Sequence, residues 1–210
     1  MAESAKQAML ILRQPTNFQW YVIPILMLVL YVYANEVEKR NWNVVFAGLA
    51  FWGMDWFNEI WNGLVFDFTN YAPLWGAPSA TAFSILIGLN IEITLMFAIA
   101  GIVCAKMLPA NPSAKILGVP NRAFFAVLLS ILFVCVEEIL HGIGVLTWEY
   151  SWWNTTAPWL VFLIGYLPFL VVSFWVHDTP SLKRKIGITA TIFSIDAVGL
   201  LLFGVILHWI

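Results

Sequence analysis

The residues of this chain best suited to chemistry are carboxylic acids embedded in long apolar stretches. Six of the 12 Asp and Glu residues lie in such stretches, where no Lys or Arg accompanies them. An ionised side chain at the centre of a bilayer costs about 2.5–3.5 kcal/mol even on the lenient insertion scale, so acids in these positions are candidates for a function. They are Asp55, Glu59, Glu92, Glu137, Glu138 and Asp196.

Helical spacing aligns two of these acids with amide side chains. Asp55, Glu59 and Asn62 follow one another at i, i+4 and i+7, which puts them on one stripe of a helix, and Asn58 lies beside that stripe. Farther along the chain, the imidazole of His141 can reach the acids at i−3 and i−4, which are Glu138 and Glu137. Adjacent helical residues point about 100° apart, so these two acids cannot both face one narrow site, and the sequence leaves open which one does.

The other polar residues fall near the middle of their apolar stretches. Asn90 and Glu92 lie in the third stretch, and Asp196 lies in the sixth and last. We therefore expect one polar cavity between the second, third, fourth and sixth stretches, open toward the non-cytoplasmic side.

Without a basic partner, buried acids can be protonated, bind a metal or face an organic cation. Protonated acids would indicate an enzyme. A protonated carboxyl can donate to an alkene or epoxide, and a second carboxylate with aromatic faces can stabilise the carbocation and remove a proton. The expected substrate is a hydrophobic, isoprenoid-like molecule that enters from the lipid bilayer. The predicted catalytic residues are Glu59, Asp196, Asp55, Glu92, Glu138 and His141, and the predicted substrate-binding residues are Trp52, Trp56, Trp61, Asn58, Asn62 and Asn90.

Two alternatives remain open. Glu138-x-x-His141 is half of a carboxylate-bridged dimetal motif, so Glu59, Glu92, Glu138 and His141 could bind a divalent metal in a membrane metalloenzyme. Alternatively, buried carboxylates that take up and release protons or cations would suit a small transporter, which at this size is expected to work as a homo-oligomer. The preferred hypothesis, acid/base chemistry, needs no cofactor.

Some of these residues resemble a known family. Glu38-Lys39-Arg40 leading into Asn58-Glu59-Ile60-Trp61-Asn62-Gly63-Leu64, with a late Asp196-Ala197, resembles the small integral membrane terpene cyclases of fungal meroterpenoid pathways. The resemblance implies metal-independent cyclisation of epoxidised prenyl chains, with Glu59 and Asp196 as the catalytic acids. That family is seven-helical, whereas six apolar stretches are counted in this chain.

Composition places the chain in a membrane. Of its 210 residues 61% are hydrophobic and 10% are charged, against about 25% charged in an ordinary soluble domain, and the mean hydropathy is +0.85. The net charge of −2 includes no basic patch, so no nucleic-acid partner is expected. Two cysteines support neither a disulfide framework nor a thiolate metal site.

The predicted fold is an all-α, polytopic membrane helix bundle that forms one domain over residues 1–210. Six transmembrane helices are expected near 18–35, 43–66, 80–105, 123–147, 158–176 and 186–209, with an interfacial helix over 3–13. Eight cations fall in the odd-numbered connections, which predicts that these connections are cytoplasmic and that both termini are not.

Overall fold

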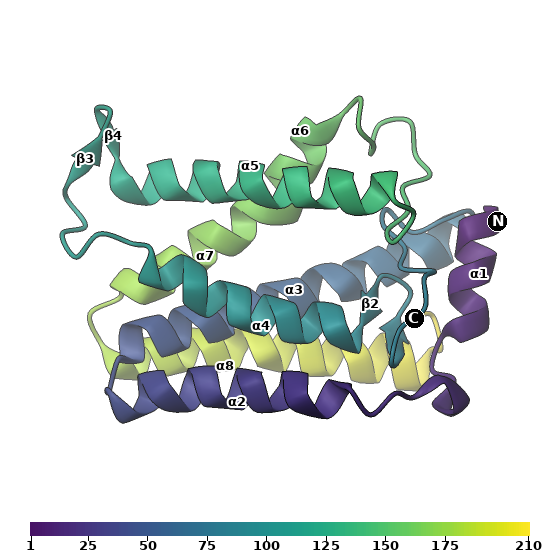
Figure 1. Ribbon diagram of the computed structural model, residues 1–210, viewed down its shortest axis with the longest axis horizontal. Helices are drawn as coiled ribbons and strands as arrows, with labels where there is room; N and C mark the ends of the chain where they lie inside the picture. Colours follow the sequence, from purple (N-terminus) through teal and green to yellow (C-terminus); the bar gives the residue numbers. More distant parts are fainter.

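The computed structural model describes the backbone of residues 1–210 and all side chains except that of residue 17. It is mostly helical, with 67% of residues in helices, and its long helices run side by side (Figure 1). They are α2 (Val22–Glu38), α3 (Trp42–Thr69), α4 (Ile91–Lys106), α5 (Asn121–Gly142), α7 (Leu167–Asp178) and α8 (Leu182–Gly199).

Shorter elements complete the chain. The helix α1 (Glu3–Ile11) and a 3-10 turn η1 (Pro15–Asn17) precede α2, and the single turn α6 (Pro158–Leu160) continues into α7 through a π-helical segment η2 (Val161–Tyr166). A second π-helical segment, η3 (Leu200–Ile206), extends α8. Two antiparallel hairpins pair β1 (Ser84–Leu86) with β2 (Leu89–Asn90) and β3 (Lys115–Ile116) with β4 (Val119–Pro120).

Three helical segments are both long and apolar enough to cross a bilayer: Asn121–Gly142, Pro158–Asp178 and Leu182–Ile206. α2 and α4 are shorter, at 17 and 16 residues, and α3 has 28 residues but carries a stripe of polar side chains. The helical membrane character predicted from composition is thus supported, while the count of six spans is not established by length and hydropathy.

α3 is the central helix, because it packs against α2, α4, α7 and α8. Its closest approach is to α4, where a Cβ added at Gly101 would lie 2.8 Å from the Gly48 carbonyl oxygen and 2.8 Å from Phe51 Cβ. Small residues at such crossings let helix backbones come together, which is how helices associate where lipid removes the hydrophobic driving force. α5, in contrast, packs against α7 and η2 and lies apart from α4.

The two ends of the bundle differ in character (Figure 1). The long connections between α3 and α4 and between α5 and α6 lie at the same end as α1 and the two termini. The turn between α2 and α3, the β3–β4 hairpin and the turn between α7 and α8 lie at the opposite end, which carries eight of the ten Lys and Arg residues.

The predicted third span is wrong at its start. Residues 80–90 form a loop and the β1–β2 hairpin, and α4 begins only at Ile91, where the Asn90 side chain accepts a hydrogen bond of 2.8 Å from the Ile93 amide. The hairpin turn brings Gly88 so close to α3 that no side chain would fit there. In the sequence, residues 80–90 therefore resemble part of a transmembrane helix, because most of them are buried in the protein, although they are not helical.

The remaining boundaries shift by a few residues. The fourth helix ends at Gly142 instead of 147, because Gly144 adopts a positive φ of +78°. The fifth is helical from 158 but contains the π-helical segment, and the sixth starts at Leu182 and ends at Ile206, before His208 with φ of +55°. The helix expected over 3–13 extends from Glu3 to Ile11.

The tight α3–α4 crossing makes a stability prediction. Gly101→Ala should destabilise the protein by about 1–3 kcal/mol, because the new methyl group meets backbone atoms that cannot move aside. Gly187→Ala in α8 is the matched control, since among the described residues no atom outside its own stretch of helix lies within 4 Å of its added Cβ. Unfolding midpoints in detergent should fall for the first variant only; equal midpoints would contradict the packing described.

Candidate functional site

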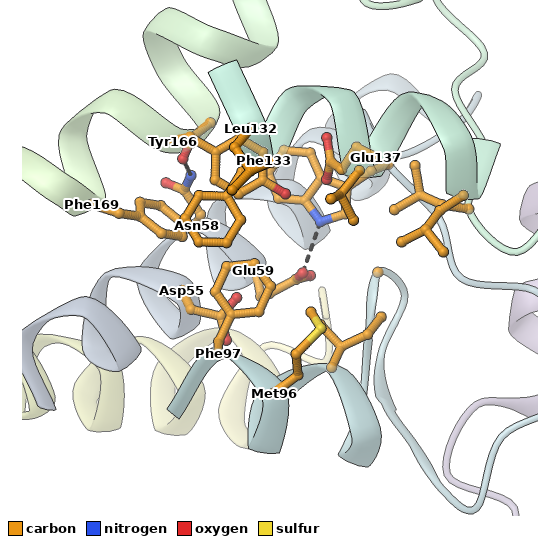
Figure 2. A pocket seen from close by; sticks show the side chains of 17 residues that line it. Asp55, Asn58, Glu59, Met96, Phe97, Leu132, Phe133, Glu137, Tyr166 and Phe169 are labelled. Atoms are coloured by element: carbon orange, nitrogen blue, oxygen red, sulfur yellow. Dashed lines mark hydrogen bonds between the residues drawn. The ribbon is translucent and has the colours of Figure 1, made fainter. Parts of the chain in front are cut away.

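A cavity of about 260 Å³ lies between α3, α4, α5 and the η2–α7 segment. Three carboxyl side chains line it: Asp55 and Glu59 from α3, and Glu137 from α5 (Figure 2). In the close-up, the two acids of α3 lie on one side of the cavity and Glu137 lies on the opposite side. Of the predicted α3 stripe, Asp55 and Glu59 therefore line the cavity and Asn62 does not.

Glu59 is held by an indole. The Trp75 Nε1–H donates a hydrogen bond of 2.8 Å to Glu59 Oε1 (Figure 2), whereas Oε2 is buried and has no hydrogen-bond partner among the described residues. A Cβ at Gly88 would lie 2.8 Å from this Oε2, so the glycine allows the hairpin to cover the carboxyl group. One oxygen is thus fixed in place while the other keeps its capacity to bind or donate a proton.

Trp75 is itself positioned by Asn62, one turn beyond Glu59 on α3. The Asn62 Oδ1 accepts hydrogen bonds from the amides of Leu74 (2.8 Å) and Trp75 (3.3 Å), and its Nδ2 donates to the Trp75 carbonyl oxygen (2.7 Å). Residues 72–77 are buried without forming a helix. Buried backbone groups need hydrogen-bond partners, and Asn62 supplies them here.

Asp55 connects the cavity to α8. Its Oδ2 is buried without a hydrogen-bond partner among the described residues, and its acidic neighbours are Glu59 and Asp196. Asp196 is also buried, neither of its oxygens is hydrogen-bonded to a described residue, and Oδ2 would lie 3.7 Å from a Cβ at Gly53. Asp196 thus approaches α3 from outside the cavity wall, so α8 contributes an acid next to the site but not in it.

Aromatic rings form the wall opposite Asp55 and Glu59. Phe133 stacks on Tyr166 at a centroid distance of 5.1 Å, and Phe97 lies 6.4 Å from Phe133 and 6.3 Å from Tyr166, both nearly parallel. Phe169 meets Phe97 edge-on at 6.0 Å. Tyr166 lines the cavity together with Glu137.

The π-helical segment η2 is what brings Tyr166 into this wall. A π turn widens the helix and frees carbonyl groups from the regular pattern, and such turns occur frequently at functional sites. Asn58 of α3 donates to two of the carbonyl oxygens, those of Ile164 (3.4 Å) and Gly165 (3.3 Å). Asn58 therefore supports the backbone of the site as well as lining the cavity.

The structure does not bring all the predicted catalytic residues together. Of the two adjacent acids of α5, Glu137 lines the cavity and Glu138 does not. His141 lies in the last turn of α5, where its ring stacks on Trp148 at 4.8 Å and its Nδ1 lies 3.2 Å from the Leu146 carbonyl oxygen. Of the predicted catalytic residues, Glu92, Glu138 and His141 therefore do not line this cavity.

Glu92 is separated from the other acids because α4 begins later than predicted. It lies in the first turn of that helix and accepts hydrogen bonds from the hydroxyls of Tyr21 and Thr81 and from the Ala82 amide (2.7 Å). Its contacts tie the loop before α4 to the start of α2, which is a structural arrangement rather than a reactive one.

The predicted substrate-binding tryptophans lie outside the cavity wall. Trp52 donates to Thr94 Oγ1 (2.8 Å), Trp56 packs with the cluster around Ile60, and Trp61 lies 6.4 Å from Trp75. Asn90, as the residue that caps α4, lines a neighbouring groove. At the loop end the cavity is lined by Trp75, Gly88 and Leu146.

Several lining residues carried no clear signal in the sequence. Phe97, Phe133 and Phe169 are common apolar residues whose orientation depends on packing. Two others had a signal: Trp75 lies between Pro73 and Pro78, which predict irregular backbone, and Tyr166 follows a glycine and precedes Leu-Pro within an apolar stretch.

The proposed metal ligands are not assembled. Within the described part of the chain, no three His, Cys, Asp or Glu side chains are grouped so that they could hold a metal ion. Glu59, Glu92, Glu138 and His141 lie in different surroundings, as described above, so the metal alternative has no geometric support.

Fold and site together define a helical membrane protein with a buried cluster of carboxyl groups. Residues 2–205 match the Uncharacterized membrane protein family, and the chain belongs to that family.

Two relatives come from the archaeon Archaeoglobus fulgidus. One "Uncharacterized protein" is 54% identical over 208 residues, which cover 99% of each chain. Another "Uncharacterized protein" is 45% identical over 53 residues, which cover 25% of this chain and 95% of that relative. No solved structure matches this chain.

The role of Asn62 can be tested by Asn62→Leu. Loss of the amide leaves buried backbone groups of Leu74 and Trp75 without partners, which should destabilise the protein by about 1–3 kcal/mol for each such group. Asn43→Leu, at an exposed position of the same helix, is the control. The comparison is made by unfolding in detergent, and a stable Asn62→Leu variant would refute the proposed support of the loop.

Proposed function

We propose that this protein is an integral membrane enzyme that performs acid/base chemistry on a lipid-soluble, isoprenoid-like substrate, as in terpene cyclisation. The observation that carries the proposal is the cavity that Asp55, Glu59 and Glu137 line together with several aromatic rings. Carboxyl groups supply and accept protons, and aromatic faces stabilise cations, so the cavity combines both requirements of carbocation chemistry.

The proposed reaction is a proton-initiated isomerisation. Glu59 donates the proton of Oε2 to an epoxide oxygen or to an alkene carbon, and the C–O or π bond opens to leave a carbocation. A second alkene of the substrate attacks this carbon and forms a ring. Glu137 then removes a proton from a neighbouring carbon, and proton exchange between the two acids restores the starting state.

Asp55 and Asp196 have supporting roles in this proposal. Asp55 lines the cavity between Glu59 and the neighbouring Asp196, so its carboxyl group adjusts the electrostatic field at the reacting carbon. Asp196, which the resemblance to terpene cyclases implies as a catalytic acid, acts here through Asp55 as a positioning residue.

In this proposal the enzyme crosses the membrane six times. Three of the crossings are the helical segments that are long and apolar enough to span a bilayer, and the other three are α2, α3 and α4. Packing against α3 supports this, because the shorter helices α2 and α4 lie alongside it. The cation-rich end faces the cytoplasm by the positive-inside tendency, so both termini and the long connections face the other side.

The enzymatic proposal is tested by turnover of a prenylated epoxide in detergent or liposomes. Glu59→Gln and Glu137→Gln keep side-chain size but cannot exchange a proton, so each should lower kcat by about 100-fold or more. Glu138→Gln, which changes the adjacent acid outside the cavity wall, is the matched control and should keep wild-type turnover. Undiminished cyclisation by Glu59→Gln would end the proposal.

A second candidate is a proton-coupled transporter. It is favoured by one observation, the extension of the acid cluster beyond the cavity to Asp196 on α8. This candidate predicts proton flux into liposomes, followed by a pH-sensitive dye, and loss of that flux in Asp196→Asn. Asp67→Asn, near the end of α3, is the control. Wild-type liposomes without flux would exclude transport of protons by this chain.

A further inference from the structure

Next to the carboxylate cavity lies a longer groove between α4 and α5. This groove has a volume of about 700 Å³, and six residues line both spaces: Ile93, Met96, Leu132, Phe133, Leu140 and Leu146. α5 packs on α7 and η2 and stands apart from α4, which is why the space between the two helices stays open. The groove and the cavity therefore adjoin, separated by these shared side chains alone.

The groove opens on the flank of the bundle. Met96 is 46% exposed and Leu132 is 54% exposed, and both line the groove as well as the cavity. Beyond this junction the groove follows α4 from Met96 past Val103 to Met107, a distance of about 17 Å at the helical rise of 1.5 Å per residue. That is a large part of the hydrocarbon thickness of a bilayer, which is about 30 Å.

The side chains that line the groove determine which kind of molecule can bind in it. Apolar side chains from α4 and α5, with Ile25 of α2, make up most of the lining, and Cys104 lies toward the Met107 end. Polar side chains occur at the opposite end only, where Ser79, Asn90 and Glu92 lie next to the loop. Such a surface accepts hydrocarbon and offers no hydrogen bonds along its length.

We propose that this groove binds one linear hydrocarbon chain of a bilayer lipid, with one end of the chain turned past Met96 into the carboxylate cavity and the remainder lying along α4. The shared wall of groove and cavity favours a chain as the occupant, because a flexible chain can pass the side chains of Met96 and Leu132 into the cavity, whereas a helix of a partner protein lying over the groove would leave the cavity unfilled. The inference rests on the proposed function insofar as the bound chain is the substrate that reacts. Binding of the chain itself can be measured without turnover.

The test uses a long-chain linear alcohol with a diazirine at its chain end, added to the full-length protein in liposomes. After illumination, mass spectrometry should find the label on the α3 peptide with Asp55 and Glu59 and on the α5 peptide with Phe133 and Glu137. Met96→Trp fills the junction and should reduce this labelling by about tenfold, the factor that a loss of about 1.4 kcal/mol in binding free energy produces.

Met27→Trp is the matched control, because Met27 is 59% exposed on α2, away from the groove. It should label like the wild type, and equal unfolding midpoints show that both variants are folded. Wild-type labelling in Met96→Trp would overturn the inference, as would label spread evenly over the exposed helices, or cross-links joining α4 and α5 to a second copy of the chain.

The variant Glu59→Gln separates this inference from the proposed function. It should keep the cavity labelling, because the amide fills the same space, while it loses turnover of the prenylated epoxide. If Glu59→Gln is labelled and keeps its turnover, the proposed chemistry alone is refuted. If Glu59→Gln loses turnover but the cavity of the wild type is not labelled, the groove inference alone is refuted.

Discussion

The arrangement of this protein depends on one requirement, that backbone groups buried inside it must find hydrogen-bond partners within the protein. Helices meet it internally, but the segment 72–77 and the π turn η2 do not. Two asparagines of α3 supply what is missing: Asn62 bonds to the loop, and Asn58 bonds to the carbonyls of the π turn. The irregular parts of the site are thus held by one regular helix.

α3 can do this because its faces carry different residues. Gly48 allows close contact with α4, and Gly53 lies against α8. The face toward the cavity carries Asp55 and Glu59. A helix with small residues at its crossings is fixed in position by backbone contact, and its polar side chains are consequently placed with little freedom.

Helical spacing was enough to predict the part of the site that lies on one element. The alignment of Asp55, Glu59 and Asn62 follows from the periodicity of α3 and required no knowledge of the neighbouring helices. The choice between Glu137 and Glu138 depends on how α5 is rotated against η2, which is a matter of packing. Glu92 was misassigned because a buried hairpin before α4 is as apolar as a span, so hydropathy could not locate the start of the helix.

The π turn in the fifth helical segment has a consequence for the rest of that segment. A π turn contains one residue more than an α turn, so it changes the angular phase between the residues before it and those after it by about 100°. Tyr166 is the last residue of η2 and Phe169 follows it in α7, and both line the cavity. Removing a single residue from η2 would restore a regular helix of full length and rotate one half of it against the other, turning Val161 and its neighbours to a different side of the bundle.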